Sequence, residues 1–137
     1  MAARSKARKR AVDILYEADL RGGDRMELLR ERVADTTTPP VNDHAVRLVE
    51  GVAQNAVRID ELIERHAHGW SLARLPDVDR AILRMAVYEL LWVDDVPDAV
   101  VLDEAVALAK ALSTDDSPAY VNGVLGAVLD AEVPAGS

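Results

Sequence analysis

Five cations, with no acid among them, lie within the first ten residues of this 137-residue chain: Arg4, Lys6, Arg8, Lys9 and Arg10. Apolar residues at helical spacing predict a helix over 5–21, so the cations gather at its N-terminal end. That end already carries partial positive charge from the helix dipole, and each cation there costs roughly a few tenths of a kcal/mol. Stability alone therefore does not explain the cluster.

Lys9 and Tyr16 are seven residues apart and share one face of the predicted helix. Phosphate contact by cations, combined with base stacking on a ring, is a common way to hold single-stranded RNA. Charge alone leaves two interpretations open, which are contact with RNA or DNA and a solvated, solubilising arm.

A second polar segment precedes the last predicted helix. Asp116 and Ser117 suit a helix N-terminus, and Tyr120, one turn further on, is either a core residue or an exposed stacking ring. Gly123 and Gly126 lie three apart within that helix, and we expect them to allow another helix to pack closely.

Other titratable residues give weaker signals for chemistry. Glu89 lies in an apolar stripe, where we expect a structural tie to an arginine or a backbone amide more than a catalytic role. His66 and His68 are two apart, so they point in different directions on a helix, and we expect surface residues and no metal site. We find no phosphate-binding loop and no nucleotide fingerprint, and we expect neither a cofactor nor enzymatic activity.

Charge is unevenly distributed along the chain. The net charge is −8, but beyond residue 10 the chain holds 11 cations against 24 acids, which would attract a basic protein partner. There are no cysteines, no signal-peptide core and no apolar run of membrane-spanning length, so we expect a cytoplasmic protein without membrane contact.

The periodicities predict an all-α fold of about seven helices in two small helical bundles packed together. The expected elements cover 5–21, 24–34, 43–68, a short turn within 69–76, 77–92, 97–112 and 117–131. The segment 77–92 is apolar nearly all round, which indicates a central helix. We expect an N-terminal subdomain over about 4–68 and a C-terminal one over about 77–131, with a seam at Pro76.

Several segments, in their order and spacing, resemble the bacterial NusB family of transcription antitermination factors. They are residues 6–16 (KARKRAVDILY), 78–90 (VDRAILRMAVYEL), 95–97 (DVP), 103–110 (DEAVALAK) and 116–125 (DSPAYVNGVL). The resemblance covers nearly the whole chain, and its central and C-terminal segments are more specific than the first helix.

The resemblance implies binding to the boxA element of ribosomal RNA transcripts together with the ribosomal protein NusE. It also implies membership of an antitermination complex on RNA polymerase with NusA and NusG. Carried over by position, Arg8, Lys9 and Arg10 match the family's arginine-rich RNA contacts, and Asp116 and Tyr120 match its second RNA-facing patch. We include Arg4 and Lys6, from the same cationic cluster, in the predicted RNA contacts. Asp79 matches an acid of the family that faces the ribosomal protein, and we expect the rest of the partner surface to consist of Tyr16, Leu72, Leu75 and Arg80.

Two alternatives remain open at this stage. The same helical fold forms an accessory RNA-binding domain in some ribosomal RNA cytosine methyltransferases, and a helical adaptor would bind only proteins. Whether the chain forms a homodimer, and what Trp70 does, are also open.

Overall fold

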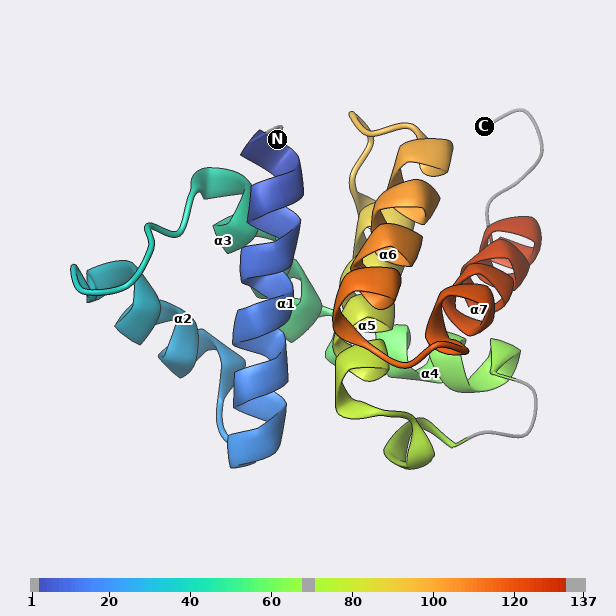
Figure 1. Ribbon diagram of the computed structural model, residues 1–137, viewed down its shortest axis with the longest axis horizontal. Helices are drawn as coiled ribbons and strands as arrows, with labels where there is room; N and C mark the ends of the chain where they lie inside the picture. The colour runs from blue at the N-terminus through green and yellow to red at the C-terminus, as the bar shows by residue number, and fades with distance from the viewer. Residues whose placement is uncertain (1–2, 68–70, 133–137) are drawn as a thin grey trace.

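The computed structural model describes residues 3–67 and 71–132, and within these ranges all regular structure is helical. The helices are α1 (Ala3–Arg21), α2 (Arg25–Ala34), α3 (Asp43–Gln54), α4 (Ala56–His66), η1 (Leu72–Arg74), α5 (Asp77–Trp92), α6 (Asp98–Leu112) and α7 (Ser117–Glu132) (Figure 1). This confirms the predicted all-α fold.

The predicted single helix over 43–68 is wrong, because it is divided at Asn55. The backbone N–H and the side-chain Nδ2 of Asn55 both donate to the carbonyl oxygen of Gly51, at 3.1 and 2.8 Å. Asn55 has φ −117° and ψ 19°, so α3 ends there and α4 begins at Ala56. An asparagine side chain that competes for backbone hydrogen bonds is a common cause of a helix end.

The helices form two bundles that meet at α5. Helices α1, α2 and α3 pack on one another, and α5, α6 and α7 do the same on the other side of the molecule (Figure 1). Helix α4 packs chiefly against α5 and α7, although the sequence places it in the N-terminal subdomain. We therefore propose that the boundary between the bundles lies at Asn55 and not near residue 68.

Helix α5 is the central element, as its apolar sequence predicts. Ten of its 16 residues are buried, and it packs against α1, α3, α4, α6 and α7. It comes close to α3 at Gly51, where an added Cβ would lie 2.0 Å from Cζ of Tyr88. Gly51 thus sets the distance between the two bundles.

Hydropathy places a further limit on the helices. None within residues 3–67 and 71–132 is both long and apolar enough to cross a membrane.

Candidate functional site

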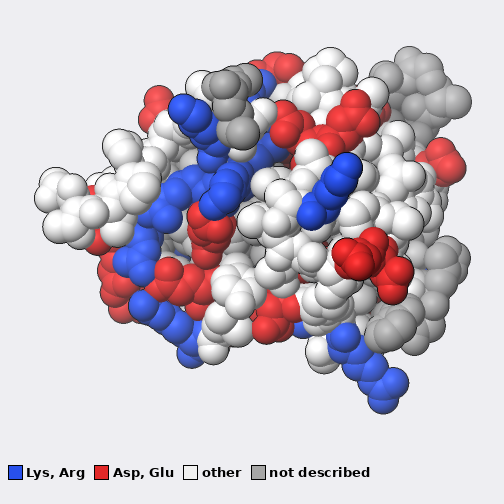
Figure 2. Space-filling view, viewed as in Figure 1, with Lys and Arg blue, Asp and Glu red and all other residues white. Residues whose placement is uncertain are grey.

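The cations of α1 have two different surroundings. Arg4, Lys6 and Lys9 are exposed and Arg10 is half-buried, so four of the five predicted RNA-contacting cations reach the surface. Figure 2 shows Lys and Arg side chains gathered over the α1 and α2 side of this face. Arg4 pairs with Asp95 at 2.9 Å and Lys9 with Asp13 at 3.3 Å, and both pairs are exposed enough to exchange for other partners.

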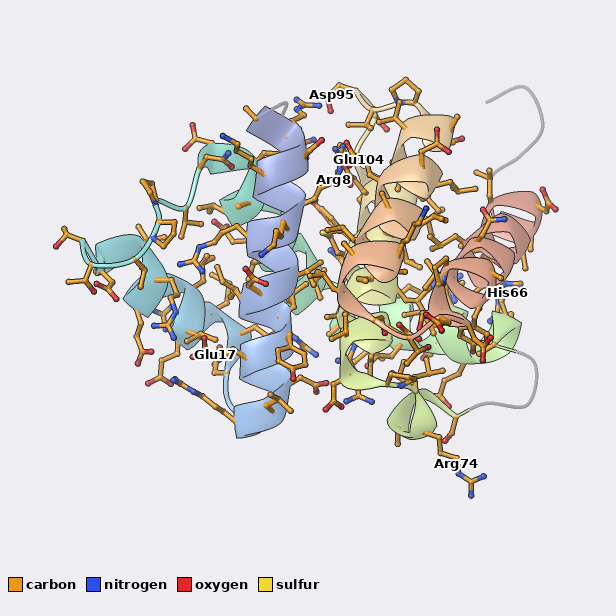
Figure 3. The ribbon with its side chains drawn as sticks, in the orientation of Figure 1. Arg8, Glu17, His66, Arg74, Asp95 and Glu104 are labelled. Carbon is orange, nitrogen blue, oxygen red and sulfur yellow. The ribbon has the colours of Figure 1, made fainter. Side chains whose placement is uncertain are left out.

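Arg8 departs from the prediction, because its side chain is only 3% exposed. Its Nε donates to both carboxylate oxygens of Glu89, at 2.8 and 3.1 Å, and its Nη2 donates to one of them at 2.6 Å. Nη1 donates to Glu104 at 3.3 Å, which links α1 to α6 as well as to α5 (Figure 3). With these donors engaged in the interior, we assign Arg8 to the packing of the bundles and not to RNA contact.

The same contacts explain Glu89. Its side chain is 1% exposed and is tied to an arginine, as the sequence predicts. Burial works against the charged guanidinium, but the hydrogen bonds and charge of Glu89, with the charge of Glu104, outweigh it and raise the pKa of Arg8. The Nε2 atom of His44 lies 3.3 Å from the Glu89 carboxylate, so three titratable side chains share this interior site.

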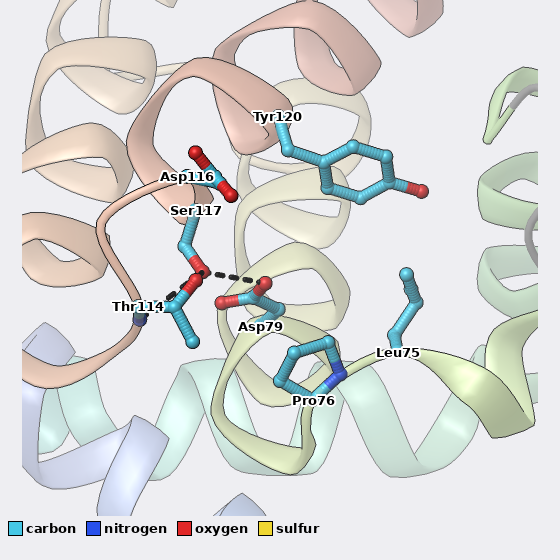
Figure 4. A pocket seen from close by; sticks show the side chains of 7 residues that line it. All are labelled: Leu75, Pro76, Asp79, Thr114, Asp116, Ser117 and Tyr120. Atoms are coloured by element: carbon cyan, nitrogen blue, oxygen red, sulfur yellow. Dashed lines mark hydrogen bonds between the residues drawn. The ribbon is translucent and has the colours of Figure 1, made fainter.

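A second site is a pocket of about 220 Å³ between the start of α5 and the turn from α6 to α7 (Figure 4). Its lining residues are Leu75, Pro76, Asp79, Thr114, Asp116, Ser117 and Tyr120. Asp116 is exposed at its rim, and Tyr120 is half-buried with its hydroxyl donating to the carbonyl of Ala67 at 3.3 Å. Burial, followed by the charge of Asp79, raises the pKa of Tyr120, so the phenol stays neutral and can donate.

Asp79 forms the floor of this pocket and does not reach the surface. It is 2% exposed and accepts hydrogen bonds from the hydroxyls of Ser113, at 2.7 Å, and Ser117, at 2.8 Å. Direct contact of Asp79 with a protein partner, as the resemblance implies, is therefore not available in this structure. Its carboxylate instead fixes the α6–α7 turn that carries Asp116 and Tyr120.

The other predicted partner residues are also largely enclosed. Leu72 and Leu75 are buried, at 7% and 5% exposed, and Tyr16 is half-buried against the core. Arg80 is half-buried, pairs with Asp19 and Asp77, and donates to the carbonyls of Leu72 and Leu75, both at 3.1 Å. The structure brings η1, Arg80 and the end of α1 together, and of the five predicted partner residues Tyr16 and Arg80 have partly exposed side chains.

Sequence reasoning missed an ion-pair cluster between the two bundles. Arg84 donates to Asp60 at 2.9 Å and lies 3.5 Å from Asp19, which also pairs with Arg80. The sequence did contain a signal, because Arg80 and Arg84 lie one turn apart on a largely apolar helix, where a buried arginine needs an acidic partner.

The prediction for the glycines of α7 is wrong. An added Cβ at Gly123 or Gly126 would meet nothing within 4 Å, so neither glycine is required by packing within the described chain. His66 is half-buried, with Nε2 3.6 Å from Glu132, while His68 and Trp70 lie outside the described residues. Within residues 3–67 and 71–132, no three His, Asp or Glu side chains are arranged to hold a metal ion.

Comparison with known proteins gives a consistent result. The sequence model of the NusB family matches residues 5–130. The transcription antitermination protein NusB of Saccharopolyspora erythraea is 66% identical over 129 residues, covering 93% of this chain and 87% of the relative. The protein of the same name from Streptomyces avermitilis is 59% identical over 130 residues, covering 92% and 90%.

Solved structures agree with the sequence matches. A solved structure of T. maritima NusB superposes with a TM-score of 0.86 at 36% identity, covering 97% of this chain and 94% of that chain. A crystal structure of the antitermination factors NusB and NusE in complex with double-stranded RNA gives a TM-score of 0.82 at 33% identity, covering 93% and 96%.

Proposed function

The chain belongs to the NusB family, and from that premise we propose that it binds boxA RNA of ribosomal RNA transcripts together with the ribosomal protein NusE. In this role it is a transcription antitermination factor that joins the complex on RNA polymerase containing NusA and NusG. It works by binding and not by catalysis, in the bacterial cytoplasm where nascent RNA is made.

The observation that carries this proposal is the exposed cationic face of α1. Arg4, Lys6, Lys9 and Arg10 present charge on a helix whose first turn contains no acid. Neutralising phosphates releases counterions from the RNA, which is the main source of affinity in such interfaces. Asp116 and Tyr120 form the second RNA contact, where the half-exposed ring offers a stacking surface and the carboxylate accepts hydrogen bonds from a base.

The protein partner binds where α1, η1 and α5 meet. Tyr16 and Arg80 supply contact atoms there, while Leu72, Leu75 and Asp79 hold the surface in shape from below. Outside the first ten residues the chain is strongly acidic, which suits a basic ribosomal protein.

Each of the two sites binds weakly, and occupation of one strengthens the other when both ligands also contact each other. The relatives that this chain covers over 87% to 95% of their length are named antitermination proteins, which favours this function over an accessory methyltransferase domain. A protein-only adaptor would leave the cations of α1 without a ligand.

A co-purification experiment tests the proposal. Immobilised protein is incubated with NusE alone, with NusE and a short boxA RNA, and with NusE and a scrambled RNA of the same composition. We expect retention of NusE to rise with boxA RNA more than with the scrambled strand. Equal retention in all three samples would contradict the RNA part of the proposal, and no retention in any would contradict both parts.

A further inference from the structure

A cleft of about 410 Å³ separates α1 from the loop that leads into α3, on the same side of α1 as its exposed lysines. One wall carries Lys6, Lys9 and Arg10 with a single acid, Asp13, and the opposite wall carries Pro39 and Pro40. The volume falls within the roughly 300–1,000 Å³ of ligand pockets, so a unit of nucleotide size fits. Neither wall belongs to the pocket at Asp116 and Tyr120.

The loop is fastened to α1 at both ends of the cleft, so the cleft exists before any ligand binds. Nη2 of Arg10 donates to Oγ1 of Thr38 at 3.4 Å, and Nδ2 of Asn42 donates to the carbonyl of Ala3 at 3.4 Å. The side-chain oxygen of Asn42 also caps α3 through the N–H of Ala45 at 2.9 Å. Such anchoring reduces the ordering cost of binding.

Arg10 has donor capacity that the chain itself does not use. Its Nε is buried, and no acceptor within the described residues lies in hydrogen-bond range. A buried donor without a partner is destabilising, so a ligand that drew the Arg10 side chain into the cleft would supply this N–H with an acceptor as well as pairing its charge. A phosphate oxygen is the acceptor that a guanidinium matches best.

The proline wall has the complementary property. Pro39 and Pro40 have no backbone N–H and their rings are rigid, so this wall is apolar and loses little entropy when covered. Lys9 already forms an exposed ion pair with Asp13, at a distance of 3.3 Å. Among the described residues Lys6 and Arg10 form no ion pair, so these two cations are the more available to a ligand. One wall of the cleft is therefore positively charged, and the opposite wall is apolar.

We infer that this cleft holds one nucleotide of the bound RNA, with its phosphate against Lys6, Lys9 and Arg10 and its sugar or base against Pro39 and Pro40. The inference rests on the proposed function and adds the loop over 38–42 as a second wall of the RNA site. RNA is favoured over an acidic peptide because the cleft is continuous with the exposed cations of α1.

A double-mutant cycle between protein and RNA tests this assignment. The Pro39→Ala/Pro40→Ala variant and the wild type are titrated, with NusE present, against boxA RNA and against strands shortened by one nucleotide at a time. Pro97→Ala, which changes an exposed proline before α6, is the matched control. We expect the double variant to lose roughly three- to tenfold in affinity, by analogy with the loss of a stacking surface.

The diagnostic result is the loss of coupling. Removing the nucleotide that occupies the cleft weakens binding to the wild type and to Pro97→Ala more than binding to the double variant, which has kept only the phosphate contacts of that nucleotide. The salt dependence of binding stays the same in all three proteins, because no charge has been changed. Equal effects of shortening in the wild type and the double variant would overturn the assignment.

Crosslinking of the unaltered protein gives a second measurement that does not depend on the variants folding. BoxA strands with 4-thiouridine at successive positions are irradiated in the complex, and the modified peptide is identified by mass spectrometry. We expect one position to label the segment 36–42, and labelling confined to other segments would overturn the inference. If the wild type binds no boxA RNA at all, the proposed function fails first, and the cleft assignment with it.

Discussion

Two neighbouring cations of α1, Arg8 and Lys9, differ in what surrounds them. The Arg8 side chain is 3% exposed and is bound to Glu89 through two nitrogens, whereas the Lys9 side chain is 54% exposed. A buried ion pair matters for stability chiefly because removing one partner leaves the other charge buried without a counter-charge. At this scale the structure separates a packing residue from a binding residue.

We predict that Arg8→Met lowers the free energy of unfolding by about 3–5 kcal/mol, because Glu89 is left buried without its cation. Lys9→Met changes an exposed residue and should alter stability by no more than about 0.5 kcal/mol. Urea unfolding followed by circular dichroism measures both. The double variant Arg8→Met/Glu89→Leu should recover much of the lost stability, because it removes both buried charges. An Arg8→Met variant as stable as the wild type would contradict the packing role and favour Arg8 as an RNA contact.

His44 gives this interior site a pH dependence. Its side chain is 8% exposed, and burial lowers its pKa below 6.5 although the charge and hydrogen bond of Glu89 act in the opposite direction. The positive charges of Arg4 and Arg8 lower it further. The folded protein therefore binds fewer protons than the unfolded chain just below pH 6.5, so stability falls as the pH drops through this range.

We predict that His44→Asn removes this component. The free energy of unfolding of the wild type should decrease relative to that of the variant between about pH 6.5 and pH 5, and the difference should be constant above about pH 7. Urea titrations at intervals of half a pH unit measure it. Parallel curves over the whole range would show that His44 keeps its ordinary pKa in the folded protein.

At the scale of the helices, the contact between α3 and α5 depends on one missing side chain. Gly51 lets the ring of Tyr88 lie against the α3 backbone, and Tyr88 in turn stacks on Trp92 with ring centroids 5.8 Å apart. Gly123 of α7 has the opposite environment, since an added Cβ would enter open space. Both glycines lie within helices, but Gly51 is required by packing and Gly123 is not.

We predict opposite effects of alanine at these positions. Gly51→Ala should destabilise the protein by about 1–3 kcal/mol or more, because the helices must separate or Tyr88 must move. Gly123→Ala should stabilise it by up to about 1 kcal/mol, because alanine favours the helical conformation. Thermal melting of both variants measures the effects, and a stabilised Gly51→Ala variant would show that α3 and α5 are less closely packed than described.

The sequence predicted elements better than it predicted their faces. Helical periodicity placed α1 within two residues of its observed start and at its observed end, and the apolar sequence of α5 identified the central helix. It did not separate α3 from α4, because that break depends on one side-chain bond from Asn55. It grouped Arg8 with Lys9 because a buried and an exposed cation cannot be told apart until the acidic partner of the buried one is located.

The candidate sites show the same limit. Asp116 and Tyr120 were placed together by the family resemblance, and the structure brings them to one pocket. Asp79 lines the same pocket from below, where its carboxylate accepts a hydrogen bond from the hydroxyl of Ser117, 38 residues further along the chain. Such long-range contacts depend on how α5 packs against the α6–α7 turn, and a single sequence does not contain that information directly.

At the scale of the whole molecule, charge is segregated. Many of the exposed cations gather on the α1 and α2 side, although others lie elsewhere, and the chain as a whole carries a net charge of −8 (Figure 2). Most of the surface therefore repels a polyanion, and an RNA strand is directed to one side of the protein. The same distribution leaves acidic surface for a basic protein, so two ligands of opposite charge can bind without competing.

The salt dependence of boxA binding tests the central claim, which is that the exposed cations of α1 hold RNA phosphates. Affinity is measured by fluorescence anisotropy over a range of salt concentrations, with NusE present, for the wild type and Lys6→Gln/Lys9→Gln/Arg10→Gln. The control variant is Arg58→Gln/Arg65→Gln, which removes two exposed cations on α4. We predict that the α1 variant reduces the slope of log K against log salt by roughly 2, at about 0.7 per lost phosphate contact, while the control keeps the wild-type slope. Equal slopes for the wild type and the α1 variant would contradict the account.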